Sequence, residues 1–401
     1  MTDLATPVNP AAVEAHSSND FIRRRNLSAV LTSLHHGGPR SRADLVNETG
    51  LNRSTVTVLV AELMELGLVR DSGTRAATGR AGRPSSSIEV DPTVAAIAVY
   101  PDIEGVTVGL VGLGGEVLSR IRFDSASPLP AKKMVKAVSS LVDGMRADIE
   151  RHYRVVGVGV AVPGLVRAGD GRVLLAPHLN WRNEPFTETL RQALGYPVIT
   201  GNESSIGAMG EVVFGAARGA RNLVYVNGTS AGVGGGIVID GALLHGTEGY
   251  AGELGHTLVN SSGRRCYCGR TGCLEIEVSQ SRLLPLLGRT RIDEDELDVE
   301  LGVARDPAVL AEVSRQVELL SEALTDFVNL FNPEIVVLAG YLGALLSVSR
   351  ERLTEAVRIR PLGGAGRAVR LERASLRSRL MLVGPAELAF GPVLRDPANF
   401  S

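Results

Sequence analysis

The chain has 401 residues, a net charge of −2, 46 glycines and only 4% aromatic residues. A nearly neutral charge excludes a protein that binds nucleic acid over its whole surface, and the length favours two or three domains. We find no secretory leader and no stretch of about 18 apolar residues, so we expect a cytoplasmic protein with no membrane partner. The glycine-rich, aromatic-poor composition favours an α/β fold.

The basic charge is concentrated near the N-terminus. Residues 1–20 hold three acids and no Lys or Arg, and we predict a disordered tail there. Residues 21–90 carry ten arginines against six acids, a local charge of +4. Leu27, Val30 and Leu34 have helical spacing, and the GGP at 37–39 ends that helix. A small basic domain over 21–90 therefore precedes a larger body over 91–401.

The segment after this helix predicts a helix-turn-helix. Ser41 is placed to cap a short helix with Asp44 in its first turn, and Gly50 is placed to stop it. A third helix follows, over RSTVTVLVAELMELGLV, with an apolar face and a small, hydroxylated and basic N-terminal end. Such an end suits phosphates and base edges. The candidate DNA contacts in this segment are Ser41, Arg53, Ser54, Thr55 and Thr57.

The stretch GLVRDSGTRAATGRAGRPSSSIEV predicts the two strands and basic tip of a wing. Arg75, Arg80 and Arg83 are spaced to enter a narrow minor groove. The alternative to DNA binding is an ordinary structural three-helix bundle, which the arginine-rich wing disfavours. Because one helix-turn-helix reads one half-site, we expect a homodimer or homotetramer on an inverted repeat of operator DNA.

From residue 93 the pattern becomes rich in β-strands. Three runs, TVAAIAVYP, EGVTVGLVGL and GEVLSRIRF, precede a helix near 130–152 and a buried strand, VVGVGVAVPG. A second set begins at NLVYVNGTSAGVGGGIVIDGALL and includes FNPEIVVLAGYLG. Two related halves with glycine turns facing a common cleft suggest a two-lobed, actin-like (ribonuclease H-like) sugar-kinase fold.

All three cysteines lie within RCYCGRTGC, residues 265–273. An odd number of cysteines argues against disulfides. The surrounding string GYAGELGHTLVNSSGRRCYCGRTGCLEIEVSQS resembles the E-x-G-H and C-x-C-G-x-x-G-C-L-E signature of the ROK family (repressor, open reading frame, kinase). The resemblance covers about residues 20–395, and the N-terminal helix-turn-helix points to the repressor branch. It implies that residues 91–401 form a sugar-binding and oligomerisation domain with a zinc loop.

The clustered cysteines have a metal-binding interpretation. His256 is placed to complete a tetrahedral Zn²⁺ site with Cys266, Cys268 and Cys273. The alternative is three inert buried cysteines, which would not require the C-x-C spacing and the glycines at 269 and 272. By resemblance to the family, the zinc is structural.

The resemblance also implies a site for a sugar or sugar phosphate. Carboxylates, an amide and an imidazole suit hydroxyl groups. The family's sugar ligands fall on Asn202, Glu203, Glu253, His256 and Glu275.

Two departures from the family pattern argue against a kinase. Tyr100 and Pro101 stand where family kinases have the start of D-x-G-G-T, and Glu203 replaces the catalytic Asp. The glycine turn NGTSAGVGGG remains, but glycines also serve tight turns. We therefore predict a sugar-responsive regulator and no enzyme, most simply a repressor released by sugar. The alternatives are an active sugar kinase with an added DNA-binding domain, and a protein-binding cleft domain that no sequence feature supports.

Overall fold

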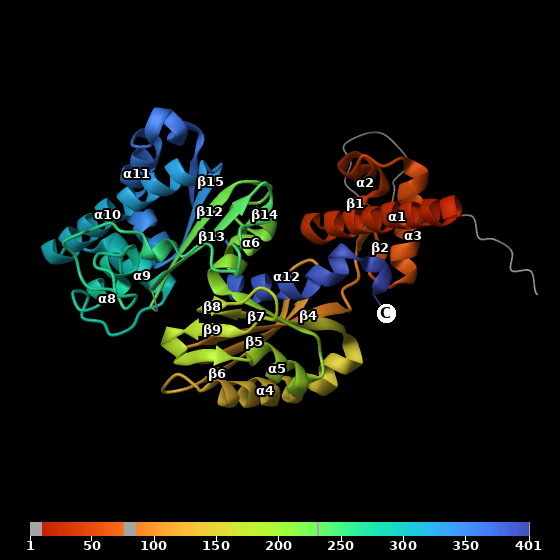
Figure 1. Cartoon of the computed structure of the whole chain (residues 1–401), viewed down its shortest axis with the longest axis horizontal. Coiled ribbons are helices and arrows are strands. Elements are labelled where there is room, and N and C mark those ends of the chain that lie inside the picture. The colour runs from red at the N-terminus through yellow and green to blue at the C-terminus, as the bar shows by residue number, and fades with distance from the viewer. Residues whose placement is uncertain (1–9, 76–85, 231, 401) are drawn as a thin grey trace, which may run out of the picture.

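The computed structural model describes residues 10–75, 86–230 and 232–400, which form an N-terminal module and two α/β lobes (Figure 1). The module holds a three-stranded sheet, and each lobe holds a five-stranded sheet. A further three-stranded sheet decorates the first lobe. Over these residues no helix is both long enough and apolar enough to cross a lipid bilayer.

The N-terminal module is a winged helix-turn-helix. Its helices are α1 (Pro10–Gly37), α2 (Arg42–Thr49) and α3 (Arg53–Glu65), and its strands are β1 (Arg40–Ser41), β2 (Val69–Arg75) and β3 (Ser86–Val90). Ser41 caps α2 in a capping box with Asp44, and Gly50 ends it in the left-handed conformation with φ 69°. Asn52 caps α3. The predicted helices, caps and paired wing strands are confirmed.

Helix α1 starts earlier than predicted. It begins at Pro10, inside the segment 1–20 that we expected to be a disordered tail, so that expectation was wrong for residues 10–20. The stretch PAAVEA has strong helix formers behind a proline suited to a first turn, and the long helix that follows extends into it.

Lobe 1 is built on a sheet in the order β11-β7-β4-β5-β6. Its strands are β4 (Val94–Asp102), β5 (Gly105–Gly112), β6 (Val117–Asp124), β7 (Arg154–Val162) and β11 (Val198–Asn202). Helices α4 (Ala131–His152) and α5 (Phe186–Leu194) cover one face. The short strands β8 (Leu165–Val166), β9 (Val173–Ala176) and β10 (Trp181–Glu184), with the 3-10 turn η1 (Pro177–Leu179), form the small extra sheet and its connection.

Lobe 2 repeats this topology with the order β14-β13-β12-β15-β16. Its strands are β12 (Leu223–Thr229), β13 (Gly232–Ile239), β14 (Ala242–Leu243), β15 (Ile335–Gly340) and β16 (Arg370–Arg373). Helices α10 (Pro307–Phe331) and α11 (Tyr341–Ile359) cover its outer face. The 3-10 turn η2 (Leu254–His256) and helices α7 (Leu274–Glu277), α8 (Gln280–Leu283) and α9 (Glu294–Val303) lie between β14 and α10 in the chain. The repeat confirms the two-lobed actin-like prediction.

Two helices lie between the lobes: α6 (Glu203–Phe214) and α12 (Leu380–Arg395) (Figure 1). Helix α12 crosses the face of the lobe 1 sheet that α4 and α5 leave open, and Gly159 of β7 lets it approach. A side chain at Gly159 would collide with the carbonyl of Pro385. The same apolar cluster continues from α12 into the winged helix-turn-helix, where Leu27, Val30 and Leu34 are buried. The module is therefore packed onto lobe 1 and α12, rather than joined by a free linker.

Candidate functional site

A cavity of about 670 Å³ opens between the two lobes. Lobe 1 contributes the turns after β7 and β9 and the start of α6, and lobe 2 contributes the glycine turn and the segment from residue 250 to 275. All five residues predicted to hold a sugar line this cavity: Asn202, Glu203, Glu253, His256 and Glu275. The fold thus brings together side chains that are up to 73 residues apart in the sequence.

Asn202 and Glu203 lie where β11 turns into α6. The Asn202 side-chain oxygen caps α6 by accepting the backbone N–H groups of Ser204 and Ser205, and its amide donates to the Gly164 carbonyl at 2.9 Å. Glu203 is only 7% exposed. Its Oε2 accepts a hydrogen bond of 2.9 Å from the Tyr100 hydroxyl. These hydrogen bonds place this end of α6 at the cavity wall.

The environment of Glu203 favours its protonated form. Burial raises the pKa of Glu203 to about 7, and the charge of Asp102 adds to the rise, although the hydrogen bond from Tyr100 opposes it. Near neutral pH the carboxyl group is thus poised to donate as well as accept hydrogen bonds, which suits a ligand rich in hydroxyl groups.

The remaining predicted ligands come from lobe 2. His256 turns its Nδ1 toward the cysteines, whereas its Nε2 lies 3.3 Å from the Tyr267 hydroxyl and 3.9 Å from Glu253. Glu253 is partly exposed to the cavity, and its pKa is raised by partial desolvation and by the neighbouring Glu275. Glu275 is buried, with Oε1 3.3 Å from His256 Nδ1 and 2.9 Å from Cys266 Sγ. Glu275 thus reaches both the cavity and the cysteine cluster.

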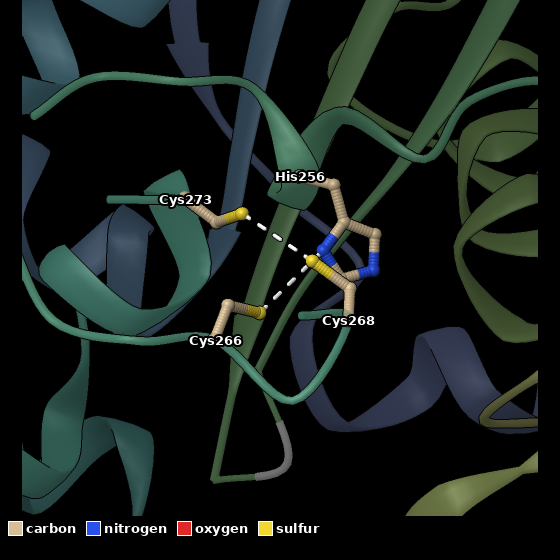
Figure 2. Close-up of side chains that lie close together, drawn as sticks. All are labelled: His256, Cys266, Cys268 and Cys273. Atoms are coloured by element: carbon tan, nitrogen blue, oxygen red, sulfur yellow. Dashed lines mark hydrogen bonds between the residues drawn. The ribbon is translucent and has the colours of Figure 1, made fainter. Parts of the chain in front are cut away.

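His256 and the three cysteines form one compact cluster, with their side chains turned toward one another (Figure 2). The ligand atoms all lie within 4.8 Å of one another. Cys268 Sγ and Cys273 Sγ are 3.6 Å apart, and Cys266 Sγ is 3.8 Å from His256 Nδ1. Ligand atoms around a tetrahedral zinc ion are about 3.5 to 3.8 Å apart. The cluster therefore fits a metal ion, and the ion would use Nδ1 and leave Nε2 facing the cavity.

The cysteine loop is held by its glycine turn, as expected, and by contacts of Glu277 that we did not predict. Gly272 has φ 77°, and a side chain there would collide with the carbonyl of Asn260. Glu277 is buried below the loop, where it accepts a hydrogen bond of 2.6 Å from the backbone N–H of Arg264. It also forms an ion pair of 3.2 Å with Arg315 of α10. These contacts fasten the loop to the core of lobe 2.

Sequence reasoning also missed several residues of the cavity wall. His178 of η1 faces Tyr267 of the cysteine loop across the cleft, with ring centroids 6.1 Å apart in an edge-to-face arrangement. Burial lowers the pKa of His178 and favours the neutral imidazole. Asn180, Arg182 and Tyr250 line the cavity as well. Only the position of Tyr267 between two cysteines could have pointed to one of these residues.

The turn between β4 and β5 is the place where the sequence departs from the family's kinase pattern, and its side chains are paired within the chain. Strand β4 continues through Tyr100 and Pro101, and Asp102 pairs with Gly105 across the turn. Asp102 forms an ion pair of 2.7 Å with Arg122. Behind Tyr100 lies a smaller cavity of about 330 Å³, whose wall includes Asp293, Glu294 and Asp295. A tyrosine and a group of acids thus occupy the surroundings of that turn.

The predicted DNA contacts separate into two groups. Arg53, Ser54 and Thr57 are exposed at the start of α3, and Thr55 is partly exposed. Ser41 is 2% exposed and bonded to Asp44, so it serves as a helix cap and our prediction that it contacts DNA was wrong. Arg80 and Arg83 lie outside the described residues, and of Arg75 the structure describes only the backbone, at the end of β2.

These observations define a two-lobed actin-like domain carrying a winged helix-turn-helix. Residues 103–391 match the ROK family, and residues 26–73 match the IclR helix-turn-helix domain. The chain belongs to the ROK family.

Relatives that match most of the chain include regulators. A xylose repressor of Caldicellulosiruptor bescii is 26% identical over 95% of this chain and 99% of its own length. The DNA-binding transcriptional dual regulator NagC of Escherichia coli K12 is 28% identical over 80% of this chain and 81% of its own length. The residues from the helix-turn-helix to the last helix thus have counterparts in proteins named as regulators.

Solved structures show the same fold. A ROK family transcriptional regulator, described as a homologue of the Escherichia coli MLC protein, superimposes with a TM-score of 0.76 over 94% of this chain and 97% of its own, at 24% identity. A ROK family glucokinase from Streptomyces griseus, in complex with glucose and AMPPNP, gives a TM-score of 0.63 over 74% of this chain and 99% of its own, at 26% identity. Regulator and kinase share the two lobes.

Proposed function

We propose that this protein is a transcriptional repressor that binds operator DNA through its winged helix-turn-helix and releases it when a sugar enters the cavity between the lobes. The proposal rests on two features found in one chain. The N-terminal end of α3 is polar and exposed, and the cavity between the lobes is lined by Glu203, Glu253 and Glu275. The xylose repressor and NagC, named as regulators, support it.

The sugar would be held by hydrogen bonds from both lobes. Glu203 serves lobe 1, while Glu253 and the Nε2 of His256 serve lobe 2. Because the two sets lie on opposite sides of the cleft, a bound sugar stabilises one relative position of the lobes. Asn202 and Glu275 have fewer side-chain atoms free for a sugar, because Asn202 also caps α6 and Glu275 also contacts Cys266.

The metal of the loop is proposed to be Zn²⁺, held by His256, Cys266, Cys268 and Cys273. Three thiolates and an imidazole are a characteristic closed zinc set, and such a site stabilises the fold without taking part in chemistry. The ion would fix the ring of His256, so that its Nε2 is presented to the sugar.

We propose that the chain transfers no phosphoryl group. Tyr100 occupies the cleft end of β4, Asp102 is paired with Arg122, and the acids behind Tyr100 would repel a triphosphate. The shared fold with a glucokinase keeps the kinase alternative open to test. An ATP-dependent phosphorylation assay over a sugar panel that yields sugar phosphate would contradict the proposal.

On DNA, we propose a homodimer or dimer of dimers that reads an inverted repeat. Arg53→Ala should weaken operator binding and reduce the slope of log affinity against log salt by about one unit if Arg53 contacts a phosphate. Arg70→Ala is a matched control, because Arg70 is exposed but pairs with Glu89 on β3.

The direct test combines a thermal-shift screen of sugars and sugar phosphates with operator binding. A ligand at 100 times its dissociation constant should add about 2.7 kcal/mol of stability. The best ligand should then lower operator affinity, and Glu253→Ala should abolish both effects. A ligand that stabilises the protein without changing operator affinity would refute its role as inducer.

A further inference from the structure

Two histidines at the end of α1 join the DNA-binding module to α12. Nε2 of His35 lies 2.7 Å from one carboxylate oxygen of Glu387, and Nε2 of His36 lies 2.9 Å from the other. His35 is only 1% exposed. Burial alone would raise the pKa of Glu387, but the hydrogen bonds from both histidines outweigh it and lower the pKa to about 2. We name this group, His35, His36 and Glu387, the joint.

The joint has the composition of a metal site, but its hydrogen bonds argue against a bound metal. The backbone N–H of Gly114 donates to His35 Nδ1 at 2.7 Å, so the ring proton is on Nε2 and is donated to Glu387. A metal on Nε2 would have to displace that proton from a ring whose other nitrogen already accepts a hydrogen bond. The joint is therefore a mechanical connection between the module, lobe 1 and α12.

Helix α6 reaches from the cavity to the joint. Asn202 caps its first turn and Glu203 is its first residue, both at the cavity wall. Its last residue, Phe214, meets the rings of His35 and His36 edge-on, at centroid distances of 5.4 and 5.9 Å. The 12 residues of α6 span about 18 Å at 1.5 Å per residue. A single helix thus touches both sites.

Helices α6 and α12 are packed with little free space between them. A side chain at Gly384 would approach a methyl carbon of Ile206 to 2.5 Å. A side chain at Gly210 would come within 2.8 Å of Leu380 and 3.7 Å of the Cα of Gly384. Because the backbones are this close, a displacement of α6 must also displace α12, and α12 carries Glu387.

We propose that Phe214 and Glu387 are the positioning residues through which α6 and α12 transmit occupancy of the cavity to the DNA-binding module. The inference deepens the proposed function and rests on it. A ligand that draws on Glu203 moves α6 along with the lobe 2 wall. Phe214 at the far end of α6, together with Glu387 of α12, then repositions His35 and His36. The recognition helix α3 moves with these histidines.

The first experiment needs no sugar. Duplexes selected from a random DNA library by the wild-type protein serve as operator, and their affinity is measured for Glu203→Ala, Glu387→Gln and the double variant. Independent distant sites give additive effects within about two-fold. We expect Glu203→Ala to change operator affinity several-fold in the wild-type background and by less than two-fold in the Glu387→Gln background. Equal effects in both backgrounds, or no effect in either, overturn the inference.

The second experiment uses D-xylose, D-glucose and N-acetyl-D-glucosamine as probes. In the wild type, an effective sugar should weaken operator binding by roughly 5- to 150-fold. Glu387→Gln and Phe214→Leu should reduce this ratio to about two-fold while leaving sugar affinity without DNA unchanged, which a merely unfolded variant would not do. A wild-type protein indifferent to all sugars contradicts the proposed function, and the sugar-free experiment then decides the inference alone.

Asp396→Asn is the matched control. Asp396 also joins α1 to the C-terminal segment, through an ion pair of 2.8 Å with Arg24, and it accepts a hydrogen bond from Asn399, so neither contact involves α6. Removing this carboxylate charge should keep the full response to sugar. If Asp396→Asn reduces the effect of sugar on operator affinity as strongly as Glu387→Gln does, any weakening of the contact between the module and the C-terminal segment has this effect. The proposed route through α6 is then wrong.

Discussion

The two lobes begin with the same pair of antiparallel strands, β4–β5 in lobe 1 and β12–β13 in lobe 2, yet the pairs present different surfaces to the cleft. In lobe 1, Tyr100 projects a side chain that bonds to Glu203. In lobe 2, Gly232, Gly234 and Gly235 line the cavity. The strand order is shared by a regulator and a kinase, so it does not separate the two functions. We propose that the residues at the first turn of each sheet separate them.

The glycines of β13 have a structural reason that involves no nucleotide. A side chain at Gly235 would approach Leu254 to 2.5 Å, and one at Gly236 would approach Ala208 of α6 to 2.6 Å. These glycines let α6 and the segment carrying Glu253 pack directly on the strand. Close packing around the cavity is therefore enough to explain why this turn is rich in glycine, without a bound nucleotide.

The largest effect should come from the cysteine loop of lobe 2, which we propose to hold zinc. Cys268→Ser should reduce bound zinc to well under one ion per chain and lower the free energy of unfolding by more than about 3 kcal/mol. Elemental analysis and urea titration measure both. Ser262→Ala, an exposed change in the same loop, should leave both unchanged. Wild-type protein that lacks zinc yet keeps full stability and sugar binding would contradict the prediction.

The burial of Glu203 in the lobe 1 side of the cavity wall should make the stability of the protein depend on pH. The pKa of Glu203 is about 7 in the fold against an ordinary value of 4.5, so the folded state holds an extra proton between these pH values. Stability should therefore fall as pH rises from 4.5 to 7, by up to about 3 kcal/mol in total. Glu203→Gln should remove this slope. Glu65→Gln on the exposed side of α3 should retain it, and an unchanged slope in Glu203→Gln would refute the assignment.

A matched pair of glycines tests the packing argument. Gly235→Ala in β13 should destabilise the protein by about 1 to 3 kcal/mol, because the new methyl group meets Leu254 and the carbonyl of Gly252. Gly112→Ala in β5 meets only the Leu118 side chain, at 3.6 Å, and should change stability by less than about 0.5 kcal/mol. Chemical unfolding of both variants gives the comparison, and equal costs would show that the lobe 2 glycines are not needed for packing.

The smallest expected effect is that of nucleotide. If the chain transfers no phosphoryl group, as proposed, Mg²⁺-ATP should not raise the melting temperature, because Tyr100 and Asp102 stand where family kinases hold the phosphates. The best sugar from the screen is the positive control in the same assay. A clear upward shift with Mg²⁺-ATP would favour the kinase alternative.

The sequence predicted the local features best. Ser41 and Gly50 marked the ends of α2 because capping depends on a few adjacent residues. The cysteine loop was recognisable for the same reason, since its ligands lie close together in the chain. The repeated order of strands and helices was enough to predict two lobes, because each strand carried its own apolar pattern.

What the sequence did not reveal depends on contacts between distant segments. Nothing near His178 indicates that it faces Tyr267, since the pairing requires both lobes. In the sequence, His35 and His36 indicate only the end of a helix. Their partner Glu387 lies more than 350 positions later, so no local pattern connects them. The same applies to Ser41, whose hydroxyl suited either a cap or a phosphate, and only its burial decided between them.

Helix α12, the last long helix of the chain, forms part of the surface on which the N-terminal module rests. Translation produces the helix-turn-helix first and the helix that steadies it nearly last. Until residues 380–395 emerge, α1 has no Glu387 to hold His35 and His36, and the lobe 1 sheet has one uncovered face. A nascent or prematurely terminated chain therefore carries a recognition helix without a fixed orientation. The chain becomes able to bind an operator and to respond to a ligand at the same time, at the end of synthesis.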